Sequence, residues 1–244
     1  MSDLTIKWGH PIVCASLRGS GKSNFCLWAI EILRPHTDVL IIMANPTSAL
    51  QYEHLRDKNT KIYDHLNSEA IDTCFSINTR RLKAGKVACH FLLVMDDSLT
   101  KNKKYDEQLN RIFQFGRLSQ INCILLQQAV QLVSTVIRDN ASYFGSFRAN
   151  TYRQKQYIFE NLLTCCETKK EAFEVINKLE RFQMIWVDYT EGAPKITLLT
   201  PPLMTSPYDE LGSKKGKTQS SPPHKDQTVF YKNSSIYELE EKKS

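Results

Sequence analysis

The sequence predicts an α/β domain with a central, mostly parallel β-sheet flanked by helices. Short apolar runs alternate along the 244 residues with longer segments of helical periodicity, which is the pattern of strand–helix–strand units. A hydrophobic content of 41% and a charged content of 24% are ordinary for a folded chain and exclude disorder throughout. We expect one domain over residues 1–200, long enough for a full core, and a flexible tail over residues 201–244.

The apolar runs place the strands, and the segments between them place the helices. Strands are predicted over residues 11–15, 39–43, 61–63, 91–95, 121–126, 143–148 and 182–188, and we expect the last of these to be the final strand. Helices are predicted over residues 21–33, 69–83, 105–119, 131–139, 154–163 and 169–179. In the third of these helices, spacings of three and four residues put Leu109, Ile112, Phe113 and Gly116 on one face, which we expect to pack inward.

The composition changes at the predicted tail. Five of the nine prolines lie in residues 201–244, mixed with Ser and Lys, as is typical of disordered or loosely packed segments. Residues 228–231 and 236–237 are apolar islands within it. They either dock on a partner or are simply apolar residues of a disordered tail.

Other features limit the compartment and the partners. The first residues show no basic segment followed by an apolar one, and no apolar run approaches the roughly 18–20 residues that span a bilayer. We therefore expect neither secretion nor a membrane segment. The seven cysteines show no metal-ligand spacing, and Cys14, Cys89 and Cys123 adjoin apolar runs, as reduced buried cysteines do. The net charge of +6 permits a polyanionic partner without requiring one.

A phosphate-binding loop is predicted between the first strand and the first helix. Residues 16–23 read SLRGSGKS, which matches the pattern GxxxxGK[ST] except that Ser16 replaces the first glycine. Gly19 and Gly21 allow backbone N–H groups to turn toward phosphate oxygens, and the helix start adds its positive dipole end. Lys22 would reach the β- and γ-phosphates, and the Ser23 hydroxyl would ligate Mg²⁺. The expected nucleotide-binding set is Ser16, Leu17, Arg18, Gly19, Ser20, Gly21, Lys22, Ser23 and Asn24.

An acidic pair closes the strand predicted over residues 91–95. Asp96 and Asp97 would reach the carboxyl edge of the sheet, where the phosphates bind. We expect Asp96 to hold Mg²⁺ and Asp97 to orient or deprotonate the attacking water. Gln128 closes the next strand, where it either senses the γ-phosphate or merely bonds to backbone. Its neighbour Gln127 should face the other way, since side chains alternate along a strand.

Positive charge for the transition state is expected from an arginine, often one supplied by a neighbouring subunit. Arg111, Arg117, Arg138, Arg148 and Arg153 all follow the acidic pair. Two basic runs, Arg80, Arg81, Lys83 and Lys86 and then Lys101, Lys103 and Lys104, are either solvated surfaces or contacts to DNA phosphates.

In their order these motifs make the chain similar to the poxvirus-type DNA-packaging ATPases within the FtsK–HerA superfamily of P-loop NTPases. The resemblance covers roughly residues 10–165. It rests on the loop at residues 17–23, the strand 39–46 closing in Asn-Pro, the double acid of 91–97, the Gly-Arg segment 115–122 leading to Gln128, and the segments 136–140 and 147–148. Ser16 in place of glycine, and Leu118 where several relatives have histidine, depart from the family pattern.

The resemblance implies a homo-oligomeric ring, pentamer or hexamer, that hydrolyses ATP at its subunit interfaces and drives double-stranded DNA into a capsid. ATP, Mg²⁺, DNA and the capsid vertex or major capsid protein are the implied ligands and partners. The implied location is the host cytoplasm or viral factory, or the virion. The resemblance also implies that Arg117 and Arg138 are the better candidates for an arginine finger acting in trans or for a sensor. The sequence does not separate these two roles.

Three other functions compete with packaging. A HerA-like translocase or helicase usually carries additional domains, for which this chain has little room. A scaffold that binds nucleotide without hydrolysis would not need the acidic pair and Gln128. A small-molecule kinase of the P-loop class would need a lid of clustered arginines, which the sequence does not show.

Overall fold

The computed structural model describes residues 4–97, 103–128, 130–164 and 166–204, and three short strand segments between residues 227 and 236. The side chains of residues 103–105, 130 and the three tail segments lie outside this description. Within it, the predicted α/β architecture is confirmed.

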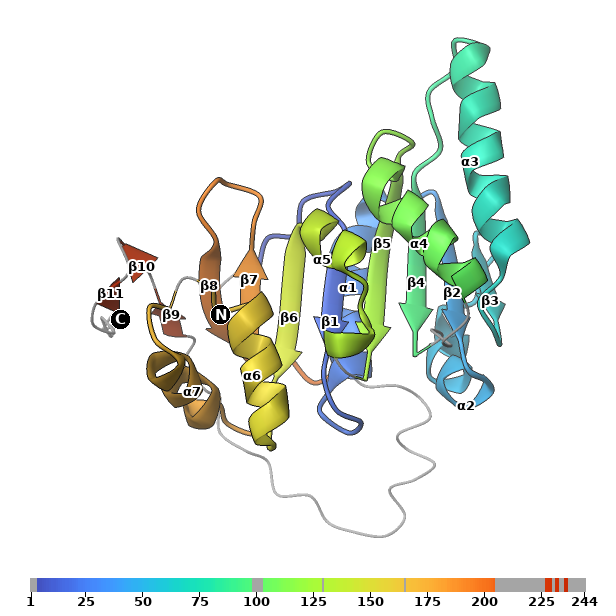
Figure 1. Cartoon of the computed structure of the whole chain (residues 1–244). Helices are drawn as coiled ribbons and strands as arrows, with labels where there is room; N and C mark the ends of the chain where they lie inside the picture. The colour runs from blue at the N-terminus through green and yellow to red at the C-terminus, as the bar shows by residue number, and fades with distance from the viewer. Residues whose placement is uncertain are drawn as a thin grey trace, which may run out of the picture.

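One sheet carries the domain, and its strands follow the order β3-β2-β4-β5-β1-β6-β7-β8-β9 (Figure 1). Its members are β1 (Ile12–Ala15), β2 (Val39–Ala44), β3 (Thr60–Tyr63), β4 (Phe91–Asp96), β5 (Ile121–Gln127), β6 (Tyr143–Phe147), β7 (Met184–Asp188), β8 (Lys195–Leu199) and β9 (Gln227–Val229). The strands from β3 to β6 in this order are all parallel, whereas β7, β8 and β9 pair antiparallel. The carboxyl ends of six parallel strands therefore share one edge of the sheet.

Helices cover both faces of the sheet (Figure 1). The helical elements are α1 (Lys22–Leu33), η1 (Arg34–His36), α2 (Pro46–Ala49), η2 (Leu50–Leu55), α3 (Ser68–Lys83), α4 (Lys103–Phe115), η3 (Val130–Leu132), α5 (Thr135–Asn140), α6 (Tyr152–Asn161) and α7 (Lys169–Lys178). One core layer joins the sheet to α3 through α7, and the other joins it to α1, α2 and η2. The buried strands have apolar residues on both faces, which is why they stand out in the sequence as apolar runs.

The predicted inward face of α4 is confirmed, but the helix ends earlier than predicted. Leu109, Ile112 and Phe113 are buried. The helix ends at Phe115 rather than continuing to residue 119, because the chain turns at Gly116 to enter β5. There the Gly116 N–H still donates to the Ile112 carbonyl (2.8 Å), while the Gly116 carbonyl accepts from the Ile121 N–H (2.8 Å).

Two further expectations are wrong. The helix predicted over residues 131–139 is split into η3 and α5, because the Ser134 hydroxyl accepts from the Ile137 N–H (3.3 Å) and starts a new helix. The strand predicted over residues 182–188 is not the final one: β8 follows it and pairs with β7. β7 itself begins at Met184, since Phe182 has a φ of 64°, outside the range of a strand.

Little of the predicted tail lies within the described residues. β9 pairs with β8, and β10 (Tyr231–Lys232) pairs with β11 (Ser235–Ile236). Residues 201–204 are described, whereas the expected disorder of the remaining residues up to 244 lies outside the described part of the chain. None of the helices that the structure describes is long and apolar enough to traverse a bilayer. Cys14 and Cys123 are buried as expected, and Cys89 is half-buried.

Candidate functional site

The glycine-containing loop leads from the end of β1 into the first turn of α1. The Ser16 N–H donates to the Gln127 carbonyl (2.9 Å), so the loop leaves the sheet beside β5. Gly19 and Gly21 have φ values of 74° and 109°, which are conformations that favour glycine. Gly21 is the residue that precedes the helix, and α1 carries no side-chain cap. Its first backbone N–H groups are therefore directed toward the loop.

Lys22 holds the loop from within. Its ammonium group is mostly buried and donates to the carbonyls of Ser16 (2.6 Å) and Leu17 (2.7 Å). Burial lowers the pKa of Lys22, while Cys14, Asp96 and Asp97 act in the opposite direction. The two carbonyls occupy two of the three donors of the ammonium group, so one donor remains for an anion such as a phosphate oxygen.

Asp96 lies on the same face of the sheet as Lys22. The residue is 3% exposed, and one carboxylate oxygen accepts a hydrogen bond from the Tyr52 hydroxyl (2.8 Å). Burial raises the pKa of Asp96 above its usual value, and Asp97 adds to that rise. The Tyr52 and Ser23 hydroxyls and the charge of Lys22 act against it. These contacts favour the ionised carboxylate that metal ligation requires.

Asp97 and Gln128 meet at the carboxyl edge. Gln128 Nε2 donates to Asp97 Oδ2, and the Asp97 N–H donates to the Leu126 carbonyl (3.2 Å). Asp97 has a φ of 51°, which turns its side chain out of the strand. Gln128 is exposed and Gln127 is buried, so the predicted alternation of the two glutamines is confirmed. The carboxylate and the amide together form a polar pair next to the loop.

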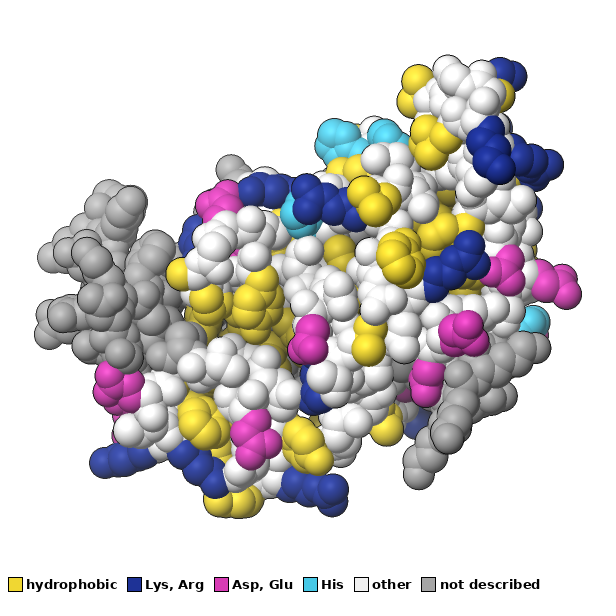
Figure 2. Space-filling view, turned by 45° about the horizontal axis from the view of Figure 1, so that its top comes forward, with side chains coloured by type: hydrophobic (Ala, Val, Ile, Leu, Met, Phe, Trp, Pro, Cys, Tyr) yellow, Lys and Arg dark blue, Asp and Glu magenta, His cyan; other side chains and the backbone are white. Residues whose placement is uncertain are grey.

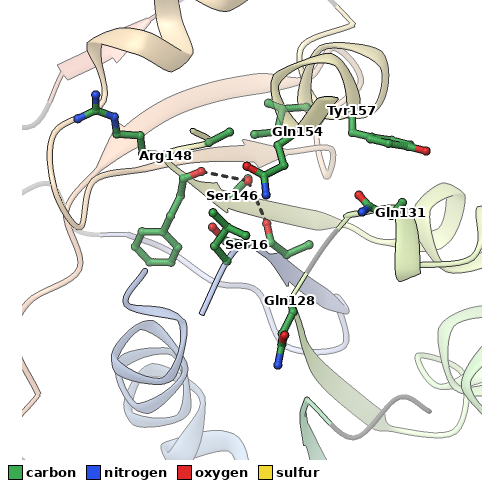
Figure 3. A pocket seen from close by; sticks show the side chains of 12 residues that line it. Ser16, Gln128, Gln131, Ser146, Arg148, Gln154 and Tyr157 are labelled. Carbon is green, nitrogen blue, oxygen red and sulfur yellow. Dashed lines mark hydrogen bonds between the residues drawn. The ribbon is translucent and has the colours of Figure 1, made fainter. Parts of the chain in front are cut away.

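A pocket adjoins the loop on the side of β6 and α6 (Figure 3). Its polar lining includes Ser16, Gln128, Gln131, Ser146, Arg148, Gln154 and Tyr157. The Ser146 hydroxyl donates to the Ala15 carbonyl (2.9 Å), which fixes the wall of the pocket to the end of β1. In the close view, Gln154 faces Ser146, whereas the guanidinium of Arg148 points away from both.

The two favoured arginines lie away from the loop within this chain. Arg117 follows α4 and precedes β5, at the edge of the sheet opposite the loop, and its side chain is close to Gly9. Arg138 lies on α5 and donates to Asn161 (2.6 Å) and Thr135 (3.2 Å). The structure therefore does not bring either arginine to Lys22 and Asp96 of the same chain.

The three other arginines, Arg111, Arg148 and Arg153, are exposed, as is the basic run of α3. Arg111 pairs with Asp72 (3.0 Å) and covers the Phe75 ring, and Arg153 lies 6.0 Å from the centre of the Tyr157 ring. The basic run of α3 is found where this helix projects beyond the sheet, and Figure 2 shows dark-blue side chains gathered there. Of the second basic run, Lys101 and the side chains of Lys103 and Lys104 lie outside the described part of the chain.

The loop fits a phosphate chain and a hard divalent cation. The buried Ser20 hydroxyl lacks a hydrogen-bond partner within the described residues, and the loop glycines expose backbone N–H groups that suit phosphate oxygens. The Ser23 hydroxyl and the Asp96 carboxylate supply oxygen donors, which Mg²⁺ prefers. No cluster of three or more His, Cys, Asp or Glu side chains suited to a metal ion occurs in the described ranges. A zinc-type site is therefore absent from them.

Sequence reasoning missed several residues of this site. Tyr52 lies in η2, which has no periodic pattern, and only the fold brings its hydroxyl to Asp96. The predicted nucleotide-binding residue Asn24 donates to the Pro202 carbonyl (2.7 Å) and accepts from the Met204 N–H (2.7 Å). The start of the predicted tail thus packs on the first turn of α1, a contact without any local sequence signal.

Comparison with solved structures reveals the same fold in viral and bacterial ATPases. B204, the DNA-packaging ATPase of Sulfolobus turreted icosahedral virus, aligns with a TM-score of 0.59 and 17% identity over 78% of this chain and 98% of its own. The genome-packaging NTPase B204 of Sulfolobus turreted icosahedral virus 2, in complex with AMPPCP, aligns with a TM-score of 0.54 and 16% identity over 77% and 96%. EssC (ATPases 2 and 3) of Geobacillus thermodenitrificans gives a TM-score of 0.63 and 11% identity over 86% and 44%.

The sequence itself carries a family signal. Residues 18–185 match the family described as poxvirus A32 protein. The match covers more than half of the chain and includes the loop from Arg18 onward, the acidic pair and Gln128. A search of curated proteins gave no significant match. On the basis of the family match, this chain belongs to the poxvirus A32 protein family.

Proposed function

We propose that this chain is an ATPase that drives double-stranded DNA into a viral capsid. One observation carries the proposal: Lys22, Asp96 and the Asp97–Gln128 pair converge at one edge of the sheet, beside a loop with the geometry of a phosphate site. Family membership supports the same function, since the structurally similar B204 proteins are packaging enzymes. Such a motor would act in the host cytoplasm or viral factory.

The proposed chemistry is the in-line attack of water on the γ-phosphate of ATP. The loop N–H groups and Lys22 would hold the phosphate oxygens and offset the charge that develops on them. Ser23 and Asp96 would hold a Mg²⁺ ion, which supplies charge neutralisation at the phosphates when bound. Asp97 would accept a proton from the attacking water, and Gln128 would hold that carboxylate in place.

We also propose that several copies of this chain assemble into a ring. Neither Arg117 nor Arg138 reaches the loop of its own chain, so we propose that a neighbouring subunit supplies the arginine. The basic end of α3 and the second basic run, Lys101, Lys103 and Lys104, would contact DNA phosphates without reading sequence. Capsid protein is the proposed docking partner of the assembled ring.

ATP hydrolysis by the purified protein, measured with and without long double-stranded DNA, tests this function. We expect DNA to stimulate hydrolysis, and we expect Lys22→Ala and Asp97→Asn to lower its rate by about 100-fold or more. Asp139→Asn, an exposed carboxylate of α5, serves as the matched control and should retain the parent rate. Parent-like turnover by Asp97→Asn would contradict the proposal. ATP binding without turnover under both conditions would instead favour a scaffold that only binds nucleotide.

A further inference from the structure

An aromatic side chain lies beside the loop and is not used in the chemistry above. A Cβ atom placed on Gly21 would lie 3.3 Å from Phe147 Cε1 and 3.3 Å from Phe182 Cδ1. Phe147 is buried, but Phe182 is 45% exposed. The residue before Lys22 therefore touches an aromatic ring that has much of its surface open. The exposed ring of Phe182 therefore lies next to the loop that we propose holds the phosphates.

The backbone of Phe182 is unusual for a large side chain. Its φ of 64° belongs to the left-handed region, where glycine is favoured and bulky residues are rare. The turn that contains it is closed by a hydrogen bond from the Gln183 N–H to the Glu180 carbonyl (3.2 Å). Because 45% of this phenylalanine is exposed, it buries less apolar surface to offset the backbone strain than a core residue would. An observed outlier of this kind points to a role outside the core.

Arg181 extends the aromatic surface. Its guanidinium carbon lies 4.8 Å from the centre of the Phe182 ring, as in a cation–π pair. Aromatic rings and arginine planes are the groups on which nucleic-acid bases stack in proteins. The two side chains therefore combine a flat apolar surface with positive charge, directly beside the phosphate loop.

We propose that Phe182, supported by Arg181, is the platform on which the base of the bound nucleotide stacks. The proposal rests on the proposed nucleotide-binding function and deepens it, because it names the part of the ligand that this surface holds. A purine fits best, since its two fused rings cover more of the phenylalanine than a pyrimidine does. The loop binds the phosphates and the platform holds the base. A polyphosphate without a base therefore lacks the stacking contact with Phe182.

Calorimetric titration of the full chain with two ligands tests this assignment. The ligands are AMPPCP, a non-hydrolysable ATP analogue, and tripolyphosphate, each with Mg²⁺. We expect Phe182→Ala to weaken AMPPCP binding by about tenfold, as loss of a stacked aromatic partner does, and to leave tripolyphosphate binding unchanged. Phe182→Tyr should bind AMPPCP like the parent. Phe115→Ala is the matched control and should change neither affinity, because Phe115 is exposed to a similar extent (52%) but lies on the opposite edge of the sheet.

A second variant separates stacking from structural support. Phe182→Gly removes the ring and suits the left-handed backbone, so its melting temperature should equal or exceed that of the parent while AMPPCP binding weakens. Equal losses for AMPPCP and tripolyphosphate, or unchanged binding of both, would overturn the platform and leave the ATPase proposal standing. If the parent bound neither ligand, both the platform and the proposed function would be overturned.

Discussion

At the scale of single residues, Asp96 illustrates how burial and hydrogen bonding oppose each other. Burial disfavours the carboxylate and raises its pKa, whereas the hydroxyls of Tyr52 and Ser23 and the charge of Lys22 favour the ionised form. Metal ligation needs the ionised form. A raised pKa keeps the Asp96 carboxyl group protonated up to a higher pH. The acid limb of the pH–rate profile for ATP hydrolysis should therefore lie at higher pH than an aspartate with an ordinary pKa would give.

Tyr52→Phe provides the test at this scale. It removes the hydrogen bond that lowers the pKa of Asp96, so the pKa should rise further and the acid limb of kcat/KM for ATP hydrolysis should move to higher pH. We also expect a loss of stability of about 1 kcal/mol, because a buried hydrogen bond is lost. The measurement is a pH–rate profile of the two proteins in parallel. A limb that stays in place or moves to lower pH would contradict the role given to Tyr52.

At the scale of secondary-structure elements, the junction between α4 and β5 depends on Gly116. A Cβ atom at this position would lie 2.4 Å from the Ile112 carbonyl oxygen and 2.7 Å from that of Ile121. Both contacts are to backbone, which cannot move aside as a flexible side chain would. The close passage of α4 into β5 therefore depends on the absence of a side chain.

We expect Gly116→Ala to lower the free energy of unfolding by about 2 kcal/mol or more, since overpacking against fixed backbone is costly. Gly192→Ala is the control: its φ of 70° disfavours alanine, but nothing lies within 4 Å of the new Cβ. Its cost should be about 1 kcal/mol. Urea unfolding of the three proteins gives the comparison. If Gly116→Ala lowered the free energy of unfolding less than Gly192→Ala, the backbone around the new Cβ atom would have to move aside without cost, which would contradict this prediction.

Across the whole molecule, Arg117 and the phosphate loop occupy opposite edges of the sheet. A ring in which one subunit presents Arg117 to the next is the arrangement that would join them. Arg138, in contrast, is already engaged by Asn161 and Thr135, which suits a structural role or a sensor. The two arginines can therefore be told apart by mixing subunits.

In a mixing experiment, Arg117→Ala and Lys22→Ala proteins should each lack hydrolysis, because an arginine finger contributes about 10³-fold or more. Combined, they should recover part of the activity, since an intact loop can then face an intact Arg117 from its neighbour. ATP hydrolysis before and after mixing is the readout, with Arg138→Ala in place of Arg117→Ala as the comparison. Recovery with Arg138→Ala alone would transfer the role of finger to Arg138, and full activity of unmixed Arg117→Ala would exclude a trans role for Arg117.

Features that depend on neighbouring residues along the chain could be predicted from the sequence alone. The apolar runs of β1, β2, β4 and β5, the glycines of the loop and the acidic pair after β4 all have local signatures. The alternation of Gln127 and Gln128 followed from strand geometry alone. Where such signatures were weak, the predictions were wrong. β8 was missed because Thr197 interrupts its apolar residues, and its pairing with β7 stabilises it.

Contacts between segments far apart in the sequence became visible only in the folded chain. Tyr52 reaches Asp96 from 44 positions away, and Phe182 meets Gly21 across the strands β6 and β7. The first residues of the predicted tail return to Asn24 over 178 positions. Such pairings arise when sheet order and helix packing bring remote segments together, and no local propensity or periodicity encodes them.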